Sequence, residues 1–209
     1  MTSPFFTTSF TKRGRIILPQ TLMVSSNIGV SRIIDDHYRN DPEKFIRGIY
    51  RTGLADNLRI PLVGASPARI RMPKKNERGE WVNWSHTALP WMSIGVPPIS
   101  TLTFYNAIAN NGKMMRPRFV KEVVKNGEVI MEFPPEVMRA HICKEKTLRE
   151  IQTILDHVVS QGLGKKAGSP SFRVAGKTGT AQMSKGAQGY KNGGTNYLLS
   201  FAGYFPEHL

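Results

Sequence analysis

Residues 174–182 read VAGKTGTAQ, and this stretch constrains the fold more than any other part of the chain. Its apolar start and small residues predict a β-strand. Residues two apart on a strand share a face, so Lys177 and Gly179 point one way, and Thr178 and Thr180 the other, unless the strand is twisted or bulged. Gly179 also allows close approach of a ligand to the backbone. A strand that carries a cation, hydroxyls and an open edge suits an extended substrate ending in a carboxylate.

A phosphate-binding loop is the first alternative, because Gly176-Lys177-Thr178 matches the last three residues of that motif. The motif requires a further glycine five positions before Gly176, and Ser171 stands there. It also requires a helix after the lysine, whereas Gly179 and a glycine-rich loop follow here. The sequence therefore argues against a phosphate loop.

A second polar segment, Ser25-Ser26-Asn27, interrupts a helix-prone stretch between Gln20 and Arg32. Taken alone, Ser25 and Asn27 would be interpreted as helix caps. Lys177 alone would be interpreted as a solvated lysine on a strand. The presence of both segments in one chain favours an active site instead.

The two segments resemble, in the right order, two of the three active-site motifs of the penicillin-binding proteins. Residues 25–29 (SSNIG) are similar to the SxN motif, and residues 177–180 (KTGT) are similar to the KTG motif. Other stretches that resemble the family are Ser93–Gly95, Ala107–Gly112, Pro117, Val158–Gly164 and Tyr197–Pro206. The resemblance spans residues 19–206, and its details indicate the monofunctional, division-type class B branch.

The resemblance implies an α+β fold of the β-lactamase/DD-peptidase type. In that fold an antiparallel sheet is covered by helices, and a helical subdomain carries SxN. The activity implied is that of a serine-type D,D-transpeptidase, which crosslinks peptidoglycan stem peptides ending in D-Ala-D-Ala and binds β-lactams. No metal and no cofactor are implied.

The same resemblance assigns roles to residues of the two motifs. Ser25 would move a proton near the leaving amine, Asn27 would orient the lysine of the nucleophile motif and the substrate amide, and Lys177 would supply positive potential and a hydrogen bond to Ser25. Thr178 and Thr180 would bind the substrate carboxylate, and the strand between them, with Gly179, would bind the substrate. The N–H of Thr180 would be one of two oxyanion donors.

The nucleophile of the family, the serine of an SxxK motif, is expected several dozen residues before SxN. Ser9-Phe10-Thr11-Lys12 has the required letters but lies too close to Ser25 and lacks helical patterning, so we interpret it as a coincidence. We therefore expect a C-terminal, internal fragment with an incomplete fold. Residues 1–18 would be a loose segment and residues 19–209 a partial transpeptidase domain. Alone, this fragment is expected to be inactive.

Composition and charge set wider limits. The 209 residues are 40% apolar and 21% charged, which is a globular balance for one domain. The net charge of +14 favours anionic partners, so a basic nucleic-acid-binding module is an alternative, although we expect no nucleic acid partner. A β-lactam sensor or a β-lactamase is the alternative within the same fold. The one cysteine, Cys143, is interpreted as structural.

The resemblance also implies a location. The intact protein is expected at the inner membrane, with its catalytic domain on the periplasmic or extracellular side and its anchor outside this chain. Division or elongation proteins are the expected partners. The sequence itself contains no apolar run long enough to span a bilayer and no signal peptide.

Turn and capping signals predict the remaining elements. Asp41 would cap a helix from Pro42 to Gly53. Asn126-Gly127 would join the two strands of a hairpin. We expect an irregular stretch over 53–90 and strands over 172–182 and 197–205. A helix capped by Ser100 or Thr101 would end at Asn111 and bury Leu102, Tyr105, Ile108 and Ala109. A capping box at 147–150 would begin a helix that buries Leu148, Ile151, Leu155, Val158 and Val159.

Overall fold

The computed structural model describes residues 8–11, 14–82, 84, 94–182 and 197–205. Its helices are α1 (Leu18–Met23), α2 (Asn27–Tyr38), α3 (Pro42–Arg51), α4 (Pro98–Ala109), α5 (Glu145–Ser160) and the 3-10 helix η3 (Lys165–Ala167). Its strands are β1 (Thr8–Thr11), β2 (Gly14–Ile17), β3 (Arg69–Ile70), β4 (Lys74–Lys75), β5 (Trp81–Val82), β6 (Ile94–Gly95), β7 (Met114–Met115), β8 (Glu122–Lys125), β9 (Glu128–Glu132), β10 (Val137–Arg139), β11 (Ala175–Gln182) and β12 (Tyr197–Tyr204). Within the described residues the strands pair two by two, and every pair is antiparallel.

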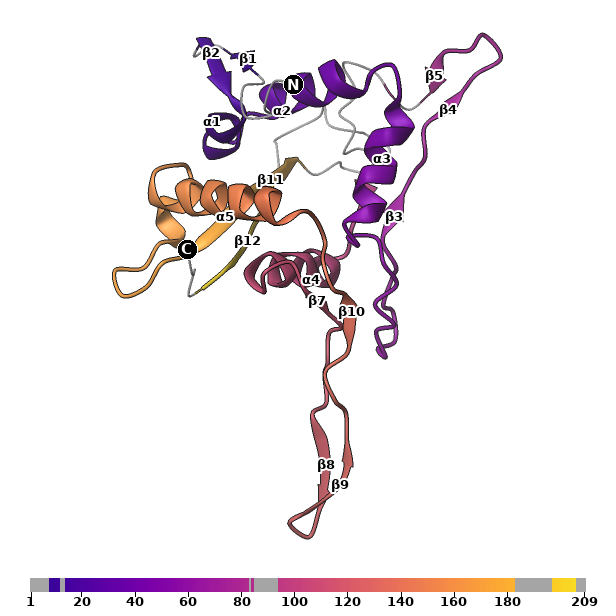
Figure 1. Cartoon of the computed structure of the whole chain (residues 1–209), viewed down its shortest axis with the longest axis vertical. Helices are drawn as coiled ribbons and strands as arrows, with labels where there is room; N and C mark the ends of the chain where they lie inside the picture. The colour runs from indigo at the N-terminus through magenta and orange to yellow at the C-terminus, as the bar shows by residue number, and fades with distance from the viewer. Residues whose placement is uncertain (1–7, 12–13, 83, 85–93, 183–196, 206–209) are drawn as a thin grey trace.

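The main core forms where two helices meet the β11–β12 ribbon. Helix α5 lies against β11, and α4 lies against β12 (Figure 1). The buried side chains of this cluster come from α4, β7, the segment between β10 and α5, α5 itself and both strands: Ala107, Ile108, Met114, Ile142, Leu148, Leu155, Ala175 and Tyr204. The arrangement agrees with the expected combination of antiparallel strands and covering helices.

Helix α5 supplies the longest apolar face of this core. The buried positions that we expected at Leu148, Leu155, Val158 and Val159 are confirmed, and Ile151 is partly buried. The predicted capping box is wrong, because α5 begins earlier, at Glu145, and its N-cap Lys144 makes no side-chain capping hydrogen bond. The helix thus begins before the predicted capping residue, Thr147, and is longer than predicted by about one turn.

Helix α4 also begins earlier than its capping signal predicted. Pro97 is the N-cap and Pro98 the first helical residue, so neither Ser100 nor Thr101 caps it. The buried face is also rotated from the expected one: Leu102 is 49% exposed, whereas Ser100 and Thr103 are buried. Proline is favoured in a first helical turn because it has no N–H to leave unpaired, and that preference decides the start here.

Residues 8–11 and 14–17, within the segment 1–18 that we expected to be loose, form paired strands. Strands β1 and β2 pair antiparallel in register, with Thr8 opposite Ile17 and Thr11 opposite Gly14. Helix α1 follows β2 directly, with Pro19 in its first turn. The hairpin lies beside α2 (Figure 1), so residues that lack a periodic pattern of their own are organised by contact with a helix.

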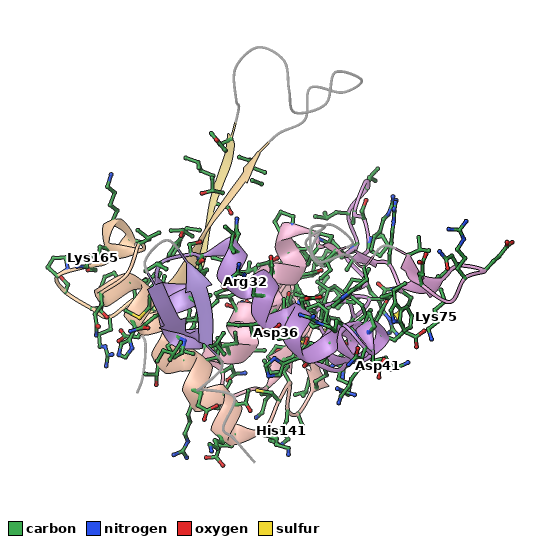
Figure 2. The ribbon with its side chains drawn as sticks, turned by 90° about the horizontal axis from the view of Figure 1, so that it is seen from above. Arg32, Asp36, Asp41, Lys75, His141 and Lys165 are labelled. Atoms are coloured by element: carbon green, nitrogen blue, oxygen red, sulfur yellow. The ribbon has the colours of Figure 1, made fainter. Side chains whose placement is uncertain are left out.

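The predicted hairpin around Asn126-Gly127 is confirmed. Strands β8 and β9 form a ribbon that projects from the body of the molecule (Figure 1). Asn126 and Gly127 both have positive φ, 52° and 84°, as a tight two-residue turn requires. The helix predicted after Asp41 is confirmed as well, since the Asp41 side chain accepts a hydrogen bond from the Lys44 N–H and Gly53 follows the helix with φ 82°. Figure 2 shows Lys75 and Lys165 at opposite sides of the molecule.

Candidate active site

The serine-rich segment forms a tight turn between two helices. Helix α1 ends at Met23 and α2 begins at Asn27. Backbone N–H groups of the turn donate to carbonyls of α1: that of Ser25 to Leu22 at 3.1 Å and that of Ser26 to Thr21 at 2.9 Å. Ser25 has a φ of 49°, a left-handed conformation that is uncommon for a serine and is retained only where neighbouring structure enforces it.

The residue after Ser25 fixes the start of the second helix. The Ser26 hydroxyl caps α2 by accepting a hydrogen bond from the Gly29 N–H at 3.1 Å. Gly29 is buried against α1, since a Cβ built on it would lie 2.7 Å from the Thr21 methyl group. The cap and the close contact between the helices hold the turn so that the Ser25 side chain, not that of Ser26, is turned toward β11.

Lys177 on β11 meets this turn across the fold. Its Nζ donates to the Ser25 Oγ at 2.7 Å, although the two residues are 152 positions apart in the sequence. The same ammonium donates to the carbonyl oxygen of Thr178 at 2.9 Å and approaches the Thr178 hydroxyl oxygen at 3.5 Å. The two segments singled out in the sequence are therefore brought into direct contact.

The surroundings of Lys177 change its acidity. The side chain is half-buried, and its three acceptors are neutral oxygens. Burial lowers the pKa of Lys177 below its ordinary value because it disfavours the charged form. A lysine of this kind combines positive potential with a reduced cost of losing a proton, which suits a group that works beside a proton-relaying hydroxyl.

The other predicted site residues lie around this pair. Thr178 and Gly179 are half-buried, and Thr180 is exposed near the end of β11. Asn27 is exposed at the first position of α2, and within the described residues its side chain makes no hydrogen bond to Ser25 or Lys177. Hydrogen bonds of Lys177 thus link Ser25 and Thr178, whereas Asn27 and Thr180 lie nearby with exposed side chains.

Ser200 is a neighbour that sequence reasoning missed. It lies directly opposite Gly179 in the β11–β12 register, and a Cβ on Gly179 would collide with its hydroxyl. Directly opposite residues share a face of a ribbon, so Ser200 lies on the same face as Gly179 and Lys177. The available signal was the spacing of the two predicted strands, but their register could not be fixed from the sequence.

Within the described residues, no cluster of three or more His, Cys, Asp or Glu side chains could hold a metal ion. The part of the chain that is described contains no helix of the length and apolarity needed to cross a bilayer. Cys143 is partly buried, and burial raises the pKa of its thiol, which agrees with a structural interpretation.

Comparison with known proteins gives consistent results. Residues 6–208 match the family described as the penicillin binding protein transpeptidase domain. Stage V sporulation protein D of Bacillus subtilis is 29% identical over 197 residues, covering 93% of this chain and 29% of that protein. The solved transpeptidase domain of penicillin-binding protein 3 from Burkholderia pseudomallei is 27% identical with a TM-score of 0.66, covering 92% of this chain and 53% of that one.

A further solved structure carries an antibiotic. It is that of penicillin-binding protein 3 from Mycobacterium tuberculosis complexed with ampicillin, which is 25% identical with a TM-score of 0.66 and covers 91% of this chain and 42% of that one. The chain therefore spans less than a third of the sporulation protein and about half of each solved chain.

Proposed function

Because this chain belongs to the penicillin-binding protein transpeptidase family, with the β-lactamase/DD-peptidase-like fold of that family, we propose that it supplies one wall of the active site of a peptidoglycan D,D-transpeptidase. The family and the fold are those predicted from the sequence. The substrate proposed is a stem peptide ending in D-Ala-D-Ala, and β-lactams are the proposed inhibitors. The observation that carries the proposal is the 2.7 Å hydrogen bond from Lys177 Nζ to Ser25 Oγ.

The chemistry follows from the direction of that hydrogen bond. Lys177 donates to the Ser25 oxygen, so the Ser25 hydroxyl proton is left free to pass to a leaving amine. As that proton leaves, the Lys177 ammonium stabilises the electron-rich serine oxygen and passes a proton to it along the hydrogen bond, which restores the Ser25 hydroxyl, and Lys177 then regains its proton from solvent. Because Lys177 is partly desolvated, this electrostatic effect is stronger than it would be in water.

The β11 strand is proposed to bind the substrate beside this pair. An extended peptide would lie along the strand, and its terminal carboxylate would accept hydrogen bonds from the hydroxyls of Thr178 and Thr180. Gly179 would let the substrate backbone come close. The N–H of Thr180 is proposed as an oxyanion donor, and Asn27 is proposed to orient the substrate amide.

A binding experiment tests the proposal without requiring turnover. The ligand is an acylated peptide ending in D-Ala-D-Ala, compared with the same peptide as its C-terminal amide, and binding is followed by NMR. We expect the carboxylate peptide to bind more tightly than the amide and to lose that preference in Lys177→Met. Lys165→Met is the matched control, because Lys165 is an exposed lysine at one end of the molecule (Figure 2). Binding that ignores either the carboxylate or Lys177 would contradict the proposal.

We further propose that the 209-residue chain alone is not acylated by β-lactams, because Ser9 lies in strand β1 and not on a helix beside Ser25. A fluorescent penicillin should leave the chain unlabelled. Covalent labelling that disappears in Ser9→Ala would overturn this part of the proposal and leave the binding result untouched. A steep salt dependence of DNA binding would instead favour the nucleic-acid alternative.

The cellular setting is also a proposal. It places the protein at the inner membrane, with the transpeptidase domain on the periplasmic or extracellular side, among the proteins of division or elongation. The support is the family itself, whose named relatives include a sporulation protein and a homologue of the D,D-transpeptidase FtsI. Accessibility of the domain to protease added outside intact spheroplasts tests the orientation.

A further inference from the structure

The loop that follows α5, Gly162–Gly164, contacts the turn that carries Ser25. The N–H of Leu163 donates to the carbonyl oxygen of Met23 at 3.0 Å. Met23 is the last residue of α1 and stands two positions before Ser25. The hydrogen bond therefore ties the end of α5 to the beginning of the catalytic turn.

Gly162 makes this contact possible because it has no side chain. A Cβ at this position would lie 2.7 Å from the Met23 oxygen and 2.8 Å from the Val158 oxygen, and both are backbone atoms that cannot rotate aside. Gly164 is different, since the atoms nearest to its Cβ position all belong to Val158, the closest at 2.9 Å. Of these two glycines, only Gly162 stands where a side chain would push the end of α5 away from the Ser25 turn.

The same end of α5 also holds the strand half of the site. The Asp156 carboxylate, 9% exposed, pairs with Arg173 at 2.7 Å. Val174 and Ala175, which follow Arg173 into β11, are buried. One helix end is thus the common support of both halves, and it fixes how far the turn stands from the strand.

Support from outside the turn matters because Ser25 is in a left-handed conformation. Such a conformation costs a serine about 1–2 kcal/mol relative to the right-handed regions and persists only if its surroundings impose it. We propose that Gly162 is a positioning residue for the candidate active site, and that the loop it begins sets the location of Ser25 Oγ relative to Lys177 Nζ. The catalytic consequence of this inference rests on the proposed function, whereas the geometry itself can be tested without a substrate.

The experiment compares Gly162→Ala with Gly164→Ala in the full chain. Both variants press a methyl group on the Val158 carbonyl, so both should lose thermal stability, but only Gly162→Ala also presses on Met23. The readout is the titration of the Lys177 amine, measured by trace acetylation at a series of pH values and peptide mass mapping. In Gly162→Ala the pKa of Lys177 should rise toward its ordinary value of 10.5, because the displaced turn admits water, and in Gly164→Ala it should match the parent chain.

A second variant covers the case in which Gly162→Ala does not fold. Replacing Leu163 by its α-hydroxy analogue turns the amide into an ester and removes the hydrogen bond to Met23 without adding an atom. It should raise the pKa of Lys177 in the same direction. An unchanged Lys177 titration in the folded variant, or an equal rise in Gly164→Ala, would overturn the inference. Neither result depends on peptide binding, so failure of the proposed function is seen separately.

Discussion

The ribbons β8–β9 and β11–β12 are both antiparallel pairs, yet they differ in what covers them. Beside α5 and α4, the base of β11–β12 buries Ala175 completely and leaves Tyr204 only 8% exposed. On β8–β9, Val124 is 52% and Ile130 59% exposed. Pairing satisfies the facing backbone groups in both ribbons, but apolar side chains leave the water only where a helix covers the ribbon, and at the far end of β12 Leu198 and Leu199 are still 60% and 72% exposed.

The comparison explains why the candidate site lies on one ribbon and not on the other. A catalytic side chain must be held in place by packed neighbours. Lys177 stands on the ribbon that α5 supports, and its ammonium reaches a partner on another element. The β8–β9 ribbon has a good turn but no support, so side chains on it could not be positioned to the same precision.

The largest expected effect comes from removing a buried side chain beneath β11. Leu155→Ala deletes a core residue of α5 that is 5% exposed, and such a change costs about 2–5 kcal/mol of unfolding free energy. Ile130→Ala on the projecting ribbon is the matched control and should cost less than about 0.5 kcal/mol. Urea unfolding of both variants measures the difference. Similar losses in the two would mean that the ribbons are equally supported.

A glycine in each ribbon gives the next largest contrast. In Gly176→Ala the new Cβ would lie 2.7 Å from the Ala202 oxygen and 2.9 Å from the Gly203 Cα, so β11 and β12 must separate. We expect a loss of about 1–3 kcal/mol in the free energy of global unfolding.

Gly127→Ala is the corresponding change in the other ribbon. It meets no atom within 4 Å, but its φ of 84° disfavours alanine, which should cost the hairpin about 1–2 kcal/mol. Since the hairpin projects alone, the loss should appear as faster amide exchange in β8 and β9 while urea unfolding of the core is unchanged. Faster exchange in α5 as well would show that the two ribbons are coupled.

Several single elements could be predicted from the sequence, because local signals are sufficient for them. Asn126-Gly127 indicated the turn, Asp41-Pro42 indicated the start of α3, and the periodicity of α5 indicated its buried face. What could not be predicted is which ribbon is covered. Cover depends on contacts between residues far apart in the chain, and local patterns do not record them.

The candidate site shows the same limit. Ser25 and Lys177 were identified by motif, but their contact across 152 positions was an expectation until the fold was known. Gly162 and Ser200 were not identified as site residues. The sequence does not show that a carbonyl of another helix packs on Gly162, or that Ser200 stands opposite Gly179. The predicted starts of α4 and α5 were both too late. Helix α4 begins at Pro98 instead of after Ser100 or Thr101, and α5 begins at Glu145 instead of after Thr147.

Ion pairs at the two ribbons should differ more modestly. Asp156 is nearly buried and anchors Arg173 at the entry to β11, so Asp156→Asn should cost about 1–3 kcal/mol by leaving polar groups poorly paired. Glu122 on β8 pairs with an exposed Lys121 at 3.5 Å. Because exposed pairs contribute little, Glu122→Gln should be indistinguishable from the parent chain in urea unfolding. An equal loss of unfolding free energy in both variants would show that the Asp156–Arg173 pair stabilises the chain no more than the exposed pair does.

The smallest effect concerns Tyr105 on α4, the helix that covers β12. Burial raises the pKa of its phenol from 10.0 to about 12, because the phenolate is poorly solvated where the ring packs against the core. Between pH 10 and pH 12 the unfolded chain loses this proton before the folded one does, so stability that is fully present below pH 10 falls as the pH rises toward 12.

Tyr105→Phe should remove this part of the alkaline loss and leave the stability at neutral pH nearly unchanged. Urea unfolding at neutral pH and near pH 11 measures the difference, which should be about 1–1.5 kcal/mol. If parent and variant lose the same stability on the alkaline side, the phenol is as well solvated in the folded chain as in the unfolded one, and α4 covers β12 less completely than its packing indicates.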